Sequence, residues 1–241
     1  MMDFISHELQ GSLDSYKSLE QLDFRIITTG VKKLPFFEDD IFLGMQAINI
    51  GLIDQLITQY EYELLREYNQ IEKTPDSTMA VSALSQMWIY ALYEVLRMWR
   101  DRKFDFEKLR KNGGVILKAN SMTDDPLNHT ITIRKKQILR FNDDKEYQQQ
   151  IDTVWNSLEE IYRAIELIRI NLAKHCAPSK DNMISMSPGY GRINEWCGAI
   201  DFQLIAKNEN HRDIIDNDSY YTTLSRRDIA DALRNFFTNH S

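Results

Sequence analysis

Residues 79–100 read MAVSALSQMWIYALYEVLRMWR, and their pattern is the strongest indication of the fold class. Large apolar side chains recur in it at steps of three or four residues, which is the spacing of one face of an α-helix. They are Leu84, Trp88, Leu92, Val95 and Trp99. Met87, Ala91 and Met98 lie beside that face, so the segment is apolar around most of its circumference. Such a helix is typical of the centre of a bundle, and we expect its aromatic and Met side chains to form core.

The segments on either side predict two more long helices. Over residues 40–73, apolar side chains again follow one another at steps of three and four. They are Ile41, Met45, Ile48, Leu52, Leu56, Tyr60, Leu64, Tyr68 and Ile71. Residues 74–77 (Thr-Pro-Asp-Ser) end this helix and cap the next, which predicts an antiparallel helical hairpin. A third long helix is predicted over residues 144–176. The predicted core comprises Leu52, Leu56, Leu84, Trp88, Leu92, Val95, Trp155, Leu158 and Ile165.

Three further segments predict strands and a last helix. Residues 199–205 alternate with a period of two and follow the turn-rich residues 188–193, an arrangement consistent with a hairpin. Residues 130–134 alternate in the same way and predict a short strand. Ser225 is placed to cap a final helix over residues 226–239.

The predicted fold class is therefore mainly α, a helical bundle with a small C-terminal appendage that contains a β-hairpin. The bundle is expected over residues 1–176. The loop, the hairpin and the final helix are expected over residues 177–241, packed on the bundle. The low numbers of Gly (9) and Pro (5) disfavour an all-β fold, which needs many tight turns.

The composition of the chain limits the classes of protein to which it could belong. The chain has 241 residues, 43% apolar residues and a net charge of −7, so a general positive field for nucleic acid is absent and any basic patch must be local. Cys176 and Cys197 cannot make a disulfide framework, which favours a reduced compartment. The N-terminus lacks the pattern of a signal peptide, and the apolar residues 79–99 contain several polar side chains. We therefore expect a soluble, cytoplasmic protein that does not span a membrane.

The first chemical candidate lies near the end of the third long helix, where Arg169-Ile-Asn-Leu-Ala-Lys-His175 places an Arg six residues before a His. This spacing resembles the ribonuclease motif of the HEPN superfamily, whose members are small, all-helical and usually dimeric. The resemblance implies that His175 transfers protons while the RNA 2′-hydroxyl attacks, and that Arg169 stabilises the phosphorane charge. It implies RNA rather than DNA as the nucleic-acid partner, and a homodimer.

Helix geometry bears on how these residues could act together. Six residues advance a helix by about 600°, so Arg169 and His175 point about 120° apart, and a two-fold dimer could bring two such pairs to one groove. Asn171 lies one turn before His175 and could orient it, as could Glu94 of the central helix. The same spacing occurs a second time, at Arg234 and His240, and the sequence does not decide between the two pairs.

Two basic segments are candidates for holding the substrate. Pro188-Gly189-Tyr190-Gly191-Arg192 offers two glycines for close backbone approach to an anion, and an Arg. The residues expected to bind there are Lys174, Tyr190 and Arg192. We expect His175 and Arg192 to border one concavity. A second set, Arg134, Lys135 and Lys136, is expected to hold the RNA backbone, with Arg140 nearby.

Structural explanations compete with each of these hypotheses. Arg169 and His175 could be cations that the helix dipole favours at a C-terminal end. The glycine segment could be a plain turn, and Glu94 with Arg97 a buried structural ion pair. No Cys-x-x-Cys or His-Glu-x-x-His spacing occurs, so we expect no metal and no cofactor. Two functions remain open, a metal-independent HEPN-like ribonuclease of the toxin or defence type, or a non-catalytic helical module that binds another protein.

Overall fold

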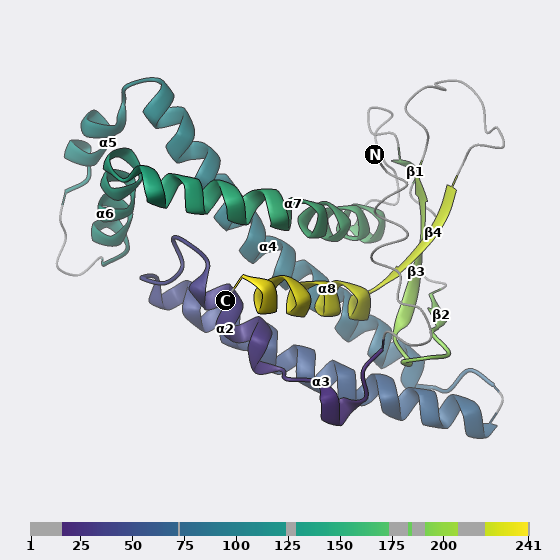
Figure 1. Ribbon diagram of the computed structural model, residues 1–241. Helices are drawn as coiled ribbons and strands as arrows, with labels where there is room; N and C mark the ends of the chain where they lie inside the picture. Colours follow the sequence, from purple (N-terminus) through teal and green to yellow (C-terminus); the bar gives the residue numbers. More distant parts are fainter. Residues whose placement is uncertain are drawn as a thin grey trace.

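The structure is a computed structural model that describes residues 16–71, 73–123, 129–173, 183–184, 191–206 and 220–240. The helices are η1 (Leu19–Gln21), α2 (Arg25–Lys33), α3 (Ile41–Ile71), α4 (Ser77–Lys111), α5 (Val115–Ser121), α6 (His129–Asp143), α7 (Lys145–Ala173) and α8 (Arg226–Asn239). The strands are β1 (Met183–Ile184), β2 (Arg192–Ile193), β3 (Ile200–Ala206) and β4 (Tyr220–Ser225). The protein is mainly α, a helical bundle with a small antiparallel sheet near the C-terminus, which confirms the predicted fold class (Figure 1).

Helix α4 is the centre of the bundle, as its sequence predicts. Trp88, Leu92, Val95 and Trp99 are all buried, and α4 packs against α3, α7 and α8. Trp88 Nε1 donates to the Ile50 carbonyl oxygen at 3.0 Å, so the polar atom of this ring is satisfied inside the core. A helix apolar around most of its circumference thus finds partners on several sides. Of the other predicted core residues, Leu158 and Ile165 are buried and Leu84 and Trp155 partly so.

Helix α3 pairs with α4 as predicted but turns the expected face outward. The predicted stripe is largely exposed, with Leu52 at 60% and Leu56 at 37% of their full accessible surface, so their expected burial is wrong. We call the exposed apolar side chains between residues 41 and 60 of this helix the α3 ridge. They are Ile41, Phe42, Met45, Leu52, Ile53, Leu56 and Tyr60. At 100° per residue they fill an arc of about 120° on one side of the helix.

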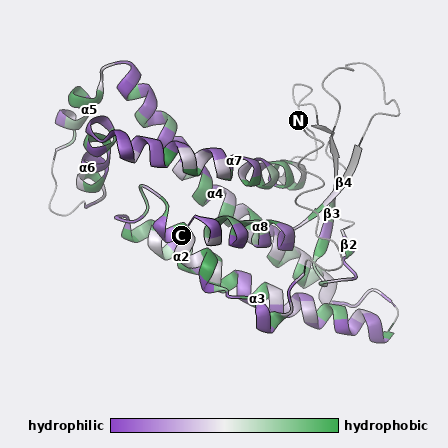
Figure 2. Ribbon diagram, viewed as in Figure 1, coloured by the Kyte–Doolittle hydropathy of each residue, from purple (hydrophilic) through white to green (hydrophobic). Residues whose placement is uncertain are grey.

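The opposite side of α3 is buried because it carries both apolar and charged groups that have partners. Ala47, Ile50 and Ile57 pack in the core, while Asp54 and Glu61 on the same side are fully buried in ion pairs with α8. The periodicity correctly predicts the helix. It does not predict which side faces inward, because the buried face contains polar residues. Hydrophobic residues recur along much of α3 in Figure 2, most densely in its N-terminal half.

Within the described residues, α3 is also a helix long and apolar enough to cross a bilayer by length and composition. A core helix of a soluble protein has the same properties. The buried carboxylates of Asp54 and Glu61 are neutralised by arginines of this chain, which is how a helix packed inside a protein accommodates charge.

The strand expected over residues 130–134 is wrong, because this segment belongs to α6. Its alternation of Thr and Ile is short, and the following residues continue with the spacing of a helix. Gln137, Ile138 and Phe141 are buried on one face, and Phe141 contacts the rings of Phe36 and Phe106. Burial of that face outweighs the local β-propensity of the first turn.

The C-terminal sheet is centred on β3, which pairs antiparallel with β1, β2 and β4. The β2–β3 pairing is the predicted hairpin, with Arg192 opposite Asp201. Strand β4 continues directly into α8, and Ser225 caps the helix as expected: its hydroxyl accepts from the Asp228 N–H while Asp228 Oδ2 accepts from the Ser225 N–H. Helix α8 then lies between α2 and α7 and also contacts α4 (Figure 1).

Candidate functional site

Arg169, the first of the predicted catalytic residues, lies on α7 against the aromatic face of α4. Its guanidinium carbon is 4.7 Å from the centroid of the Tyr93 ring. Among the described residues, no carboxylate forms an ion pair with it, and its side chain is partly exposed. Stacking on a Tyr ring holds a guanidinium in place while leaving its N–H groups able to meet an anion.

The surface around Arg169 is an array of tyrosines and charged groups shared by α4 and α7. Tyr93 donates to Glu166 Oε1 at 3.2 Å and stacks on Tyr162 with ring centroids 5.7 Å apart. Arg100 Nη1 donates to the Tyr162 hydroxyl at 2.7 Å. Burial raises the pKa of Tyr162, and its contacts with Tyr93 and Glu166 raise it further, so this phenol stays protonated. The array fixes the positions of the rings on which Arg169 rests.

Glu94, proposed from the sequence as an orienting group, lies on the outer side of α4. It forms the expected ion pair with Arg97, with Oε2 2.7 Å from Nη2, and Arg97 also pairs with Asp101 at 3.0 Å. The expectation that the Glu94–Arg97 pair is buried is wrong: the two side chains are 50% and 40% exposed. The residue before Glu94 faces α7, so Glu94 itself turns to solvent, and such a surface pair adds little stability.

The structure describes only some of the other residues of the ribonuclease hypothesis. Asn171 belongs to the last turn of α7, and Arg192 is an exposed residue of β2. His175, Lys174 and Tyr190 lie outside the described residues, as does Cys176. The predicted concavity between His175 and Arg192 therefore stays a prediction.

The alternative pair, Arg234 and His240, is distinguished by its environment. Arg234 is buried and its guanidinium is used twice, by Asp54 of α3 and by Asp231 of its own helix. His240 Nδ1 is 2.8 Å from the Phe236 carbonyl oxygen, at the C-terminal end of α8. A guanidinium held by two carboxylates inside the protein cannot reach a phosphate. Of the two arginines, Arg169 is the one whose surroundings allow contact with an anion.

A buried ionic network that the sequence analysis missed accounts for Arg234. Arg226, the first residue of α8, is fully buried and donates to Glu61 Oε1 at 2.9 Å, to Glu61 Oε2 at 2.6 Å and to Thr58 Oγ1 at 3.0 Å. It also contacts Asp54. Burial raises the pKa of Glu61, and Arg226 acts against that rise. The network joins α3 to α8 and is structural, since its carboxylates form ion pairs with arginines of the same chain.

A sequence signal for this network exists. Asp54, Thr58 and Glu61 follow one another at steps of four and three residues, and so would share one face of a helix within an otherwise apolar segment. Such polar residues are buried only with partners, which predicts a complementary cationic segment elsewhere. The spacing does not predict that the cationic partners are Arg226 and Arg234.

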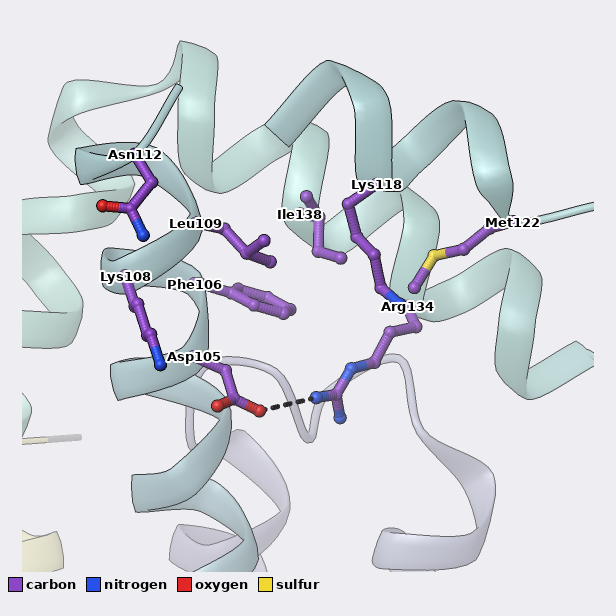
Figure 3. Close-up of a pocket in the computed structure, with 9 residues that line it drawn as sticks. All are labelled: Asp105, Phe106, Lys108, Leu109, Asn112, Lys118, Met122, Arg134 and Ile138. Carbon is purple, nitrogen blue, oxygen red and sulfur yellow. Dashed lines mark ion pairs between the residues drawn. The ribbon is translucent and has the colours of Figure 1, made fainter. Parts of the chain in front are cut away.

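The basic cluster predicted at residues 134–136 is divided by the structure. Arg134 lines a pocket of about 440 Å³ formed by α4, α5 and α6 (Figure 3). Lys136 is exposed and Lys135 part-buried, and neither lines this pocket. Arg140 pairs with Glu38 at 3.1 Å and lies 3.8 Å above the Tyr147 ring. The pocket is lined by Asp105, Phe106, Lys108, Leu109, Asn112, Lys118, Met122, Arg134 and Ile138.

The pocket and Arg169 lie far apart. Helix α6, which carries Arg134, meets the N-terminal part of α7, whereas Arg169 lies near its C-terminal end (Figure 1). At 1.5 Å per residue, the stretch of α7 between these ends is roughly 30 Å or more. The residues predicted as one substrate-binding and catalytic set therefore belong to two separate surfaces.

Searches against known protein families, characterised proteins and solved structures find no match. Within the described part of the chain, no group of three or more His, Cys, Asp or Glu side chains is arranged to hold a metal ion.

Proposed function

We propose that the protein is a metal-independent ribonuclease of the HEPN-like kind, in which Arg169 and His175 act on the RNA phosphodiester. The observation that carries the proposal is the guanidinium of Arg169, held 4.7 Å over the Tyr93 ring with no carboxylate partner among the described residues. The competing Arg234 is buried and doubly ion-paired. A fixed, unneutralised guanidinium is what stabilises charge on a pentacoordinate phosphorus.

In this proposal each residue has a defined task. His175 accepts the proton of the 2′-hydroxyl as its oxygen attacks phosphorus, and the bond from phosphorus to the 5′ oxygen breaks. The leaving 5′ oxygen takes a proton from the imidazolium of a second copy of the chain, and Arg169 neutralises the equatorial oxygens meanwhile. The products are a 2′,3′-cyclic phosphate and a 5′-hydroxyl. The carboxylate of Glu94 is held by Arg97, so orientation of His175 is left to Asn171.

The test is incubation with total RNA in EDTA, which removes the metal that contaminating nucleases need. We expect the wild type to cleave, and His175→Ala and Arg169→Ala each to lose about 100-fold or more of the rate. The matched control is Arg163→Ala, because Arg163 is an exposed arginine of the same helix whose partner, Glu159, is one turn away. It should cleave normally.

Three results would overturn the proposal. The first is full activity of His175→Ala, and the second is a loss of activity in Arg163→Ala equal to that in Arg169→Ala. The third is a product that ends in a 3′-hydroxyl, since attack by the 2′-hydroxyl cannot produce it. Loss of cleavage in His240→Ala with normal activity of His175→Ala would transfer the chemistry to the other pair.

A second function, assembly of two copies, is favoured by the α3 ridge. Its seven side chains are 37–76% exposed and extend from residue 41 to residue 60, about 29 Å along the helix. At roughly 200 Å² for a large side chain, they expose on the order of 700 Å² of mainly apolar surface. That exceeds the largest patch of a typical monomer and approaches the roughly 800 Å² that each partner of a stable pair buries. We propose a second copy of this chain as its occupant.

Substitution of one ridge residue tests this assembly. Leu52→Glu should convert a dimer to a monomer in size-exclusion chromatography with light scattering, because a buried, unpaired carboxylate would lie in the interface. Leu117→Glu is the control: Leu117 is 78% exposed on α5 and outside the ridge. A wild type that is monomeric across the micromolar range, or one that binds lipid vesicles through Leu52 instead, would contradict the proposal.

A further inference from the structure

The pocket between α4, α5 and α6 has a cationic rim. Lys108 comes from α4 and Asn112 follows directly after its last residue, while Lys118 and Arg134 come from α5 and α6 on the other side of the pocket (Figure 3). Among the described residues that line the pocket, Asp105 is the one that is acidic. The described residues of the rim therefore carry three positive charges and one negative charge in a protein whose net charge is −7. Such a concentration of cations lowers the energy of an anion in the pocket.

The three cations are not equivalent. Arg134 is held in place, with Nη2 3.6 Å from Asp105 Oδ2 and its guanidinium carbon 5.4 Å from the centre of the Phe106 ring. Lys108 and Lys118 are exposed, and among the described residues neither takes part in an ion pair. A positioned guanidinium with two lysine ammonium groups lining the same pocket is suited to a phosphate group, which accepts several charge-assisted hydrogen bonds.

The rest of the lining is apolar. Leu109, Met122 and Ile138 lie between the two sides of the rim, with the ring of Phe106 buried beside them. The volume of about 440 Å³ is within the range of small-molecule sites. A bare inorganic anion would leave the apolar part of such a pocket unfilled. A ligand that combines a phosphate with a flat, partly apolar body uses both parts.

We propose that this pocket binds a nucleotide, with the phosphate between Lys108, Lys118 and Arg134. The base then covers Leu109 and Met122, and the Asn112 amide is within the same pocket to meet its polar edge. The nucleotide is either free or the terminal nucleotide of an RNA strand. Binding here goes beyond the proposed cleavage and does not depend on it, since Arg169 lies toward the other end of α7.

Calorimetric titration of the full chain tests the proposal. The probes are adenosine, adenosine 5′-monophosphate, and a short RNA with either a 5′-phosphate or a 5′-hydroxyl; the RNA titrations use His175→Ala so that cleavage does not consume the probe. We expect the monophosphate to bind at least about tenfold more tightly than adenosine. Tighter binding of the 5′-phosphorylated RNA than of the monophosphate identifies a strand end as the ligand, and equal binding identifies a free nucleotide.

Variants separate a built pocket from a diffuse positive field. Lys108→Gln and Lys118→Gln should each weaken monophosphate binding about fivefold to tenfold, because each removes a charge at the phosphate. Lys111→Gln is the matched control: it removes one exposed charge nearby, on α4, without lining the pocket. All three side chains are exposed, so folding is preserved, which circular dichroism verifies. Equal weakening by Lys111→Gln, equal affinity for adenosine and its monophosphate, or no binding by the wild type would overturn the proposal.

Discussion

Replacement of Arg226 by Met perturbs the buried ionic network at its centre. The side chain length is kept, but Glu61 and Thr58 lose all their hydrogen bonds from Arg226 and Asp54 loses one of its two α8 partners. Arg226, Asp54 and Glu61 are each 0% exposed, so water cannot replace the lost partner. Removal of one member of a buried ion pair costs about 3–5 kcal/mol. Against a total stability of roughly 5–15 kcal/mol, that loss is a large fraction.

The loss of stability in Arg226→Met should depend on pH, and the direction of this dependence follows from the pKa of Glu61. Burial raises the pKa of Glu61 above its usual value, and Arg226 counteracts this. Without Arg226 the pKa rises further, so the folded variant takes up a proton that its unfolded chain has already released. A raised folded-state pKa supports the folded state at low pH and loses that support as pH increases. The deficit of Arg226→Met relative to wild type should therefore be larger at pH 8 than at pH 5.

Urea unfolding followed by circular dichroism measures both effects. Tryptophan fluorescence is the less suitable signal, because the guanidinium carbon of Arg226 lies 5.4 Å from the Trp88 ring centre and its removal changes the emission directly. The control is Arg163→Met, which breaks an exposed pair with Glu159 and should cost at most about 0.5 kcal/mol. A loss below about 1 kcal/mol for Arg226→Met would show that the network contributes little to stability, and a loss that is the same at both pH values would show that Glu61 does not titrate as expected.

Two further substitutions test the attachment of the sheet to the bundle. Gly198 has a φ of +74°, and a Cβ at this position would lie 1.8 Å from the Glu61 carbonyl oxygen. Gly198→Ala should therefore lower the free energy of unfolding, measured in urea, by at least about 2 kcal/mol. The control is Gly114→Ala, where the neighbouring atoms lie 3.7 Å away, and a similar cost for both variants would show that the contact at Gly198 is not rigid. Burial raises the pKa of Asp201 to about 6, and nearby Asp228 adds to the rise. Asp201 therefore favours the folded state below its unfolded pKa and loses that contribution as pH increases through about 6. Asp201→Asn should become more stable relative to wild type between pH 4 and pH 7.5, by about 1–2 kcal/mol; an unchanged difference across that range would contradict this.

The sequence predicted α4 well because hydrophobic pattern and environment agree there. Trp88, Leu92 and Trp99 share one face, and helices cover that face on several sides. On α3 the two disagree, since the most regular apolar stripe is the exposed one. The inward face contains Asp54 and Glu61, whose burial depends on Arg226, 165 or more residues further along the chain. Periodicity is local information, and it cannot show which polar residues will find a partner so distant in sequence.

The same long-range pairing limited the prediction of the candidate site. Arg169 and Arg234 have the same spacing to a following His, so the sequence alone treats them equally. They differ in what the fold places beside them, a Tyr ring for Arg169 and two carboxylates for Arg234. Of the basic residues predicted at 134–136, the fold places only Arg134 in the pocket, and the other cations that line it are Lys108 and Lys118.

The positions of the three surfaces make the proposed activities separable. The α3 ridge faces away from the helices that α3 contacts, so a dimer formed through it is not expected to bring two copies of Arg169 into one groove, which the proposed proton transfer requires. If Leu52→Glu is monomeric at the assay concentration and RNA cleavage persists, a second copy is not needed, and the proposed proton transfer from the imidazolium of another copy is wrong. If cleavage is lost together with the dimer, the ridge dimer itself supplies the second copy that the proposed proton transfer requires. The nucleotide pocket lies on neither surface, so its affinity for adenosine 5′-monophosphate should be the same in the monomeric variant and the dimeric wild type.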